Sequence, residues 1–125
     1  MILADTSVWI DHLRVPDAML QRLLEQGDVL LHPFIIGEIA LGSMPQYAFV
    51  MRRLALMPQA SKAADDKVLY FIRQHKLHGT GIGYIDAHLL AAALLTREGL
   101  LWTRDKRLHR IATAMGIAFA AQGSA

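Results

Sequence analysis

The chain contains no cysteine, which excludes disulfide bonds and thiolate metal sites. Long apolar runs are also missing, and the longest uncharged apolar stretch, 89–95, is too short to cross a bilayer. At the N-terminus, Asp5 interrupts the apolar residues before the pattern of a signal peptide can form. We therefore expect a cytoplasmic protein with no membrane segment.

Neither sign of charge dominates, since 13 Lys and Arg residues stand against 11 Asp and Glu residues, a formal net charge of +2. This mild basic excess permits a polyanionic partner without requiring one. The basic residues occur in local groups, and each group is either a solvated helix face or a contact to a polyanion. At 125 residues the chain is long enough for a core of its own, and we expect one domain over 1–125.

Short apolar runs alternate with segments of helical periodicity along the chain. The runs predict strands at 2–4, 28–32, 100–103 and 117–120. Spacing and capping residues predict helices that begin at 6, 17, 33, 45, 62, 84 and 106, the first capped by a hydroxyl side chain and the fifth by Ser61. This alternation predicts an α/β fold with a central parallel sheet between two layers of helices.

Four acidic residues stand at or near the ends of predicted elements: Asp5, Glu38, Asp86 and Asp105. The first three are each the lone charge in an apolar run. An isolated carboxylate in such surroundings costs several kcal/mol unless something compensates it, and clustered carboxylates also repel one another. A shared divalent cation would compensate all four. Oxygen ligands without cysteine favour Mg²⁺ or Mn²⁺ over zinc.

Each acid also has a plain structural explanation when it is considered alone. Asp5 can end a strand, and Asp105 can cap a helix. The first helical turn suits Asp86, because the helix dipole stabilises negative charge there. Glu38 resists such an explanation most, since it lies mid-helix with no basic residue three or four positions away. The joint pattern persuades because Asp5 and Asp105 follow parallel strands, whose carboxyl ends share one edge of a sheet.

Other chemistry-bearing patterns are absent or incomplete. The spacing of the glycines in 79–83 does not match a dinucleotide fingerprint, and the sequence has no phosphate loop, nucleophile elbow or paired D-x-D acids. His75 and His78 weakly resemble a zinc pair but have no third ligand at a useful spacing. The remaining histidines are expected on the surface or as hydrogen-bonded core residues: His12, His32, His88 and His109.

Four ordered stretches carry a family resemblance: LADTSVWID at 3–11, GE at 37–38, GYIDAHLLA at 83–91 and LWTRDKRL at 101–108. Together they resemble PIN-domain ribonucleases, specifically the VapC-type toxins of bacterial toxin–antitoxin pairs. The resemblance covers essentially the whole chain. It implies a PIN-like three-layer α/β/α sandwich and an endoribonuclease that depends on Mg²⁺, or alternatively Mn²⁺.

The resemblance also implies roles for individual residues. The metal-binding and catalytic quartet falls on the four acids, with Thr6 and Thr103 in support of the site. The metal ion would activate a water that attacks the phosphodiester in line, leaving 5′-phosphate and 3′-hydroxyl ends. Three basic residues beside the crevice would hold the RNA backbone: Arg104, Lys106 and Arg107.

Partners follow from the same resemblance. VapC-type toxins are usually homodimers held by a cognate VapB-like antitoxin, whose C-terminal segment lies across apolar helices. Candidate residues for that groove also read as ordinary core: Met19, Leu23, Tyr47, Val50, Met51 and Leu54. Two rival functions remain open at this point. One is a catalytically silent PIN-like module that binds RNA or protein, and the other is a different metal-dependent phosphoesterase, such as a flap-type DNA nuclease.

Overall fold

The sheet at the centre of the molecule has three parallel strands in the order β2-β1-β3. The structure is a computed structural model, which describes residues 1–120. Strand β1 (Ile2–Ala4) lies in the middle, between β2 (Val29–Leu30) and β3 (Leu100–Trp102). Apolar residues fill these strands almost without interruption, as expected for parallel strands that are covered on both faces.

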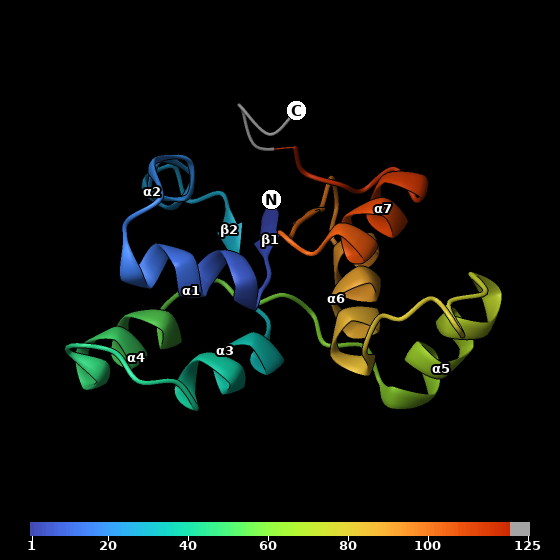
Figure 1. The fold of residues 1–125 in the computed structure, drawn as a ribbon, viewed down its shortest axis with the longest axis horizontal. Helices are drawn as coiled ribbons and strands as arrows, with labels where there is room; N and C mark the ends of the chain where they lie inside the picture. The colour runs from blue at the N-terminus through green and yellow to red at the C-terminus, as the bar shows by residue number, and fades with distance from the viewer. Residues whose placement is uncertain (121–125) are drawn as a thin grey trace.

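Seven helices lie around this sheet within residues 1–120 (Figure 1). Helices α1 and α2 lie on one side of β1 in this view, and α6 and α7 lie on the other, so the predicted α/β architecture is confirmed. The helices are α1 (Thr6–Arg14), α2 (Ala18–Glu25), α3 (Pro33–Ala40), α4 (Tyr47–Ala55), α5 (Asp65–Gln74), α6 (Tyr84–Leu95) and α7 (Lys106–Ala114).

Helix α6 forms the most buried part of the helical layers. It is apolar almost all the way round, and all seven residues from Ala87 to Ala93 are buried. Such a helix belongs inside a domain, since it has no polar face for solvent. Four of these seven residues are alanines, whose small side chains let α6 pack against β1 and β3. No helix in the described part of the chain is both long and apolar enough to cross a bilayer.

Polar side chains cap the N-termini of several helices. The carboxylate of Asp105 accepts from the backbone N–H of Leu108, as the sequence predicts. Asp17, where a helix is expected to begin, caps α2 by accepting from the backbone N–H of Leu20. At α1, however, the cap is the carboxylate of Asp5, which accepts from Val8 N, and not a hydroxyl as expected. The first acid of the quartet is therefore also a helix cap.

Several predicted boundaries are wrong, and tertiary contacts explain two of them. The helix expected from 62 begins at Asp65, because residues 59 and 60 pair with Leu31 and the chain leaves that contact in extended form. Ser61 consequently caps nothing. The strand expected at 117–120 reduces to one bridge between Ala118 and Leu101, and the strand at 28–32 shortens to Val29–Leu30 plus a bridge at Leu31.

Candidate active site

Asp5 lies at the carboxyl end of the central strand and is 6% exposed. Its Oδ1 accepts from Ser7 Oγ at 2.5 Å and from Val8 N at 3.3 Å, and its Oδ2 accepts from Thr103 Oγ1. Burial raises the pKa of the Asp5 carboxyl, although these hydrogen bonds act in the opposite direction. Burial has the larger effect on this pKa, so the charged form of Asp5 needs further positive charge nearby.

Thr103 ties the two strands of the site together, in line with its predicted supporting role. Its hydroxyl donates to Asp5 and accepts from the backbone N–H of Asp105 at 3.0 Å. A second link runs from Arg104 N to Ser7 Oγ at 3.1 Å. These contacts join the start of α1 to the turn before α7, across nearly the full length of the sequence.

Glu38 enters the site from α3 and is half-buried. Its Oε1 accepts from the hydroxyl of Thr6 at 2.5 Å. Thr6 is the first residue of α1, so this bond joins α1 to α3 beside Asp5. The hydroxyl supplies the polar partner that Glu38 lacks on its own helix.

Asp86 completes the set from the first turn of α6. Its Oδ2 accepts from Gly83 N at 3.2 Å, which fixes the carboxylate at the helix start. The pKa of Asp86 is raised first by burial and then by the negative charges of the three other acids, Asp5, Asp105 and Glu38. The negative charges of the three other predicted acids therefore all reach Asp86, which places the four carboxylates near one another.

The four acids offer only carboxylate oxygens, which suit a hard divalent cation. Their side chains do not, however, form a complete coordination shell. Within residues 1–120, no three His, Asp or Glu side chains form a group that could hold a metal ion. Like charges keep such carboxylates apart, and a cation would draw them inward. Asp105 is exposed and its Oδ1 is occupied as the α7 cap, at 2.9 Å from Leu108 N.

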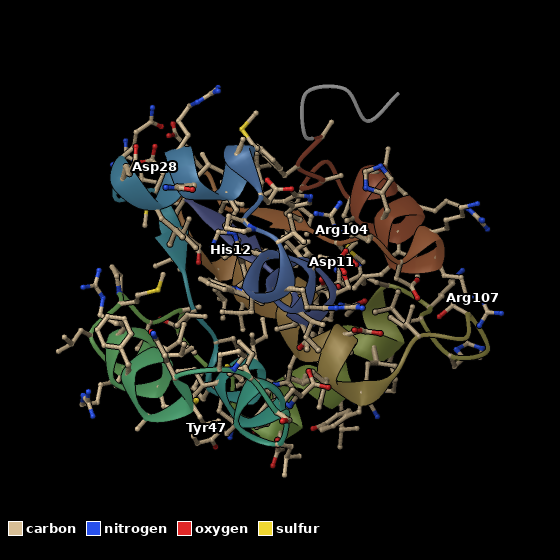
Figure 2. All side chains as sticks on the ribbon, turned by 60° about the vertical axis from the view of Figure 1, so that its left-hand side comes forward. Asp11, His12, Asp28, Tyr47, Arg104 and Arg107 are labelled. Atoms are coloured by element: carbon tan, nitrogen blue, oxygen red, sulfur yellow. The ribbon has the colours of Figure 1, made fainter. Side chains whose placement is uncertain are left out.

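The three predicted RNA-binding residues have different surroundings. Arg104 pairs with Asp11 at 2.9 Å and with Asp17 at 3.1 Å, beside α1 and α2 (Figure 2). Arg107 lies against Gly81, where an added Cβ would come within 2.6 Å of its guanidinium nitrogen. Gly81 also has φ of +89°, which favours glycine. Lys106 is exposed on the first turn of α7 and forms no ion pair within residues 1–120.

Two features of the site are not predicted from the sequence. The sequence pattern indicates only a helix start at Ser7, yet the Ser7 hydroxyl bonds directly to Asp5. A hydroxyl two residues after a strand-end aspartate was the available signal, because such side chains turn back onto local acceptors. The contact between Gly81 and Arg107 joins segments 26 positions apart in the sequence and has no local signal.

The expectation of a hydrogen-bonded core residue is confirmed for His32, which is fully buried and whose Nδ1 accepts from Phe34 N at 3.0 Å, although its Nε2 has no partner within the described residues. The expectation is wrong for His88, because its ring is fully buried and neither nitrogen has a hydrogen-bond partner within the described residues. His88 Nε2 lies 3.3 Å from Asp65 Oδ1 without hydrogen-bond alignment. The rings instead pack edge-on against each other and against Phe34 and Tyr84.

The residues considered for an antitoxin groove lie mostly in or against the core. Leu54 is buried, and the partly buried side chains of Met19, Leu23, Val50 and Met51 pack against the main core cluster. Tyr47 alone is exposed, with its hydroxyl donating to Ala40 O. The structure thus favours the core explanation for most of this set.

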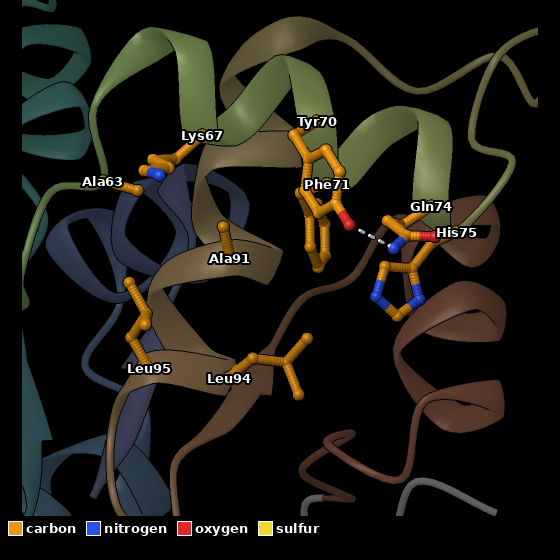
Figure 3. A pocket seen from close by; sticks show the side chains of 9 residues that line it. All are labelled: Ala63, Lys67, Tyr70, Phe71, Gln74, His75, Ala91, Leu94 and Leu95. Carbon is orange, nitrogen blue, oxygen red and sulfur yellow. Dashed lines mark hydrogen bonds between the residues drawn. The ribbon is translucent and has the colours of Figure 1, made fainter.

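A separate apolar pocket of about 590 Å³ lies between α5 and α6 (Figure 3). Phe71, Ala91, Leu94 and Leu95 are among its lining residues, and Gln74 Nε2 donates to the hydroxyl of Tyr70 at its rim. None of the four acids lines it. This pocket has the composition of a contact surface and not of a hydrolytic site.

Comparison with known proteins decides the family. The model of the PIN domain matches residues 2–114. This chain belongs to the PIN-domain family. Over 124 residues, this PIN domain is 44% identical to the proteins named ribonuclease VapC32 from two strains of Mycobacterium tuberculosis. The match covers 99% of the chain and 100% of each relative. The resemblance to VapC-type PIN ribonucleases is therefore confirmed.

A solved structure supports the fold independently. The crystal structure of PAE2754 from Pyrobaculum aerophilum superposes on this PIN domain with a TM-score of 0.57. The superposition covers 88% of this chain and 78% of that one, at 18% sequence identity. At such low identity the likeness speaks for the fold alone, and it agrees with the three-layer arrangement around a parallel sheet.

Proposed function

We propose that this PIN domain is an endoribonuclease of the VapC type, the toxin of a toxin–antitoxin pair, and that it hydrolyses RNA with the help of a divalent cation. The observation that carries the proposal is the placement of four carboxylates around one site. Thr103 bonds to Asp5 and to the backbone N–H of Asp105, Thr6 bonds to Glu38 beside Asp5, and the negative charges of the other three acids raise the pKa of Asp86. Relatives named ribonuclease VapC32 that match along the whole chain support the choice of RNA over DNA as substrate.

The metal ion would be Mg²⁺ or Mn²⁺, held by Asp5 and Asp86 in the first place, with Glu38 and Asp105 completing the site. When bound, such an ion neutralises charge on the scissile phosphate and favours deprotonation of the attacking water. Burial raises the pKa of Asp5, and burial together with the negative charges of the other three acids raises that of Asp86, so both gain most from a neutralising cation.

The chain's own hydrogen bonds set the positions of these carboxylates. Ser7 and Thr103 hold the two oxygens of Asp5 from opposite sides, and Thr6 holds Glu38. The backbone N–H of Gly83 fixes Asp86 against the start of α6. Because these donors are already in place, water and phosphate can be oriented with little rearrangement of the backbone.

Partners belong to the same proposal. We expect a VapB-like antitoxin and a homodimer, with activity in the cytoplasm. Exposed apolar side chains support contacts with other proteins, since Tyr70, Leu94 and Leu95 around the α5–α6 pocket are 43% to 64% exposed. The residues first considered for the antitoxin offer less, because most of them are already packed against the core.

The test is cleavage of RNA by the purified chain, with Mg²⁺, with Mn²⁺ and with EDTA, followed by end mapping. Cleavage with either ion, loss of cleavage in EDTA, and products with 5′-phosphate ends are expected. A parallel reaction with single-stranded and flap DNA separates the ribonuclease from a DNA nuclease. No cleavage with either ion, or cleavage that persists in EDTA, would contradict the proposal.

A further inference from the structure

A groove of about 810 Å³ runs beside α7. We refer to it as the α7 groove, lined among others by Trp102, Thr103, Lys106, His109, Arg110 and Phe119. Thr103 belongs to both places, since it lines the groove and its hydroxyl donates to Asp5. The groove therefore adjoins the acidic site at Thr103.

Positive charge lies along one face of α7. Lys106 and Arg110 are four residues apart, so they follow one another on the helix surface. The opposite face packs into the core through Leu108 and Ala112, which are fully buried. Both basic residues are exposed, and neither forms an ion pair within residues 1–120.

These two residues differ from the neighbouring arginines. The guanidinium of Arg104 is held by the carboxylates of Asp11 and Asp17. Arg107 extends away over the loop that contains Gly81. Arg104, Lys106 and Arg110 all line the groove, but only Lys106 and Arg110 form no ion pair within residues 1–120, so their charges are the ones available to an incoming polyanion.

Aromatic rings stand beside these charges. The rings of Trp102 and Phe119 lie 5.1 Å apart, with Trp102 buried and Phe119 half-buried. Unpaired cations next to an accessible aromatic face are the combination that binds single-stranded nucleic acid, because the cations hold phosphates and the ring stacks on a base.

We propose that the α7 groove binds single-stranded RNA immediately next to the scissile phosphate. Lys106 and Arg110 hold backbone phosphates, and Phe119 contacts a base. This inference rests on the proposed ribonuclease function and adds to it the path of the substrate. It also replaces Arg104 and Arg107 with Arg110 as the partner of Lys106 in holding RNA.

The test measures binding of a fluorescein-labelled single-stranded RNA 20-mer in EDTA, where the proposed cleavage is suppressed. The double variant Lys106→Ala/Arg110→Ala is compared with Arg52→Ala/Arg73→Ala, which removes two exposed arginines from α4 and α5, outside the groove. Loss of two phosphate contacts reduces the slope of log affinity against log salt by about 1.4 for a single strand. We expect that reduction and about tenfold weaker binding for the groove variant, and less than about twofold change for the control.

A third variant examines the base contact. Phe119→Leu should weaken binding by about fivefold without changing the salt slope, because stacking and not charge is lost. Thermal unfolding of all variants checks that they fold like the parent chain.

The outcomes separate the two proposals. Cleavage of RNA by the parent chain together with equal binding by groove and control variants would overturn the groove assignment and leave the ribonuclease standing. Selective loss of binding to an acidic protein partner by the groove variant, with RNA binding unchanged, would also overturn it. A parent chain that neither binds nor cleaves RNA would overturn both.

Discussion

Two regions of this molecule bury titratable side chains and treat them in opposite ways. In the acidic crevice, both oxygens of Asp5 accept hydrogen bonds, from two hydroxyls and a backbone N–H. In the histidine cluster, formed by His32, Phe34, Tyr84 and His88, three buried ring nitrogens have no partner within the described residues. One region is equipped for charge, and the other excludes it.

The pKa shifts express the same difference. Burial lowers the pKa of His32 to about 4 and also lowers that of His88, so both rings are neutral packing groups near neutral pH. Burial raises the pKa of Asp5, but its hydrogen bonds favour the charged form. A buried carboxylate that accepts hydrogen bonds can stay charged and bind a cation. A buried ring without such partners contributes mainly through packing. Four predictions test this distinction.

The largest effect is expected from Asp5→Asn. Loss of the central carboxylate should reduce RNA cleavage by about 10²–10³-fold, because a ligand charge for the metal ion disappears. Asn still caps a helix, and the raised pKa of Asp5 means that its charge costs stability at neutral pH. Thermal unfolding should therefore show an equal or higher midpoint. Asp66→Asn, an exposed acid on α5, is the matched control, and cleavage equal to it would contradict the metal site.

The second prediction concerns acid stability. The folded-state pKa of His32, about 4, lies below the ordinary value of 6.5, so the unfolded chain binds more protons between these values. Above about pH 6.5, neutral His32 makes its full contribution to the free energy of unfolding. This contribution decreases by on the order of 2 kcal/mol as the pH falls towards 4.

Denaturant unfolding at pH 7 and pH 4.5 measures this contribution. His32→Asn keeps a helix-capping side chain but does not titrate, so its stability should fall less between the two pH values than that of the parent. His75→Asn, at an exposed position, should behave like the parent. Parallel pH dependence in all three chains would show that His32 is not a buried neutral group.

The third prediction distinguishes the members of the quartet. Asp105→Asn should reduce cleavage by only about tenfold, the size expected for a group that supports a metal site. The carboxylate of Asp105 is exposed and already caps α7, and Asn can take over that cap without loss of stability. A loss of activity as large as that of Asp5→Asn would instead make Asp105 a direct ligand.

The smallest effect is expected from Thr103→Val, which removes one donor to Asp5. The loss of one hydrogen bond should reduce cleavage by about fivefold. Since that bond lowers the pKa of Asp5, its removal should move the acidic limb of the pH–rate profile to higher pH. Thr103→Ser retains the hydroxyl and should restore the parent profile; a profile unchanged in the valine variant would remove Thr103 from the site.

Much of this site could be predicted because its carboxylates stand at element ends that the sequence marks well. Asp5 and Asp105 follow apolar strand runs, and the parallel arrangement carries both to one edge. The cap at Asp105 and the helix start near Asp17 are likewise predicted by local patterns. The assignment of metal and RNA contacts to individual residues, and of one domain to 1–125, stays a prediction.

What could not be predicted depends on contacts between distant segments. The pairing of residues 59 and 60 with Leu31 delays the start of α5, and no local pattern in 61–64 announces it. The helical spacing of Leu69 with Val68 and Ile72 predicts an inward side chain, but Leu69 is 55% exposed. The burial of His32 and His88 arises where α3 meets α6, so a sequence window contains only one of the two rings.

The order of strands also governs when the site can exist. The central strand β1 is the first made, but its neighbour β3 and the hydroxyl of Thr103 come 98 residues later. A nascent chain therefore already contains Asp5, Glu38 and Asp86 before the strand that completes the site has been made. Synthesis of β3 and Thr103 is what completes the crevice, so the proposed nuclease stays inert until that strand has been made.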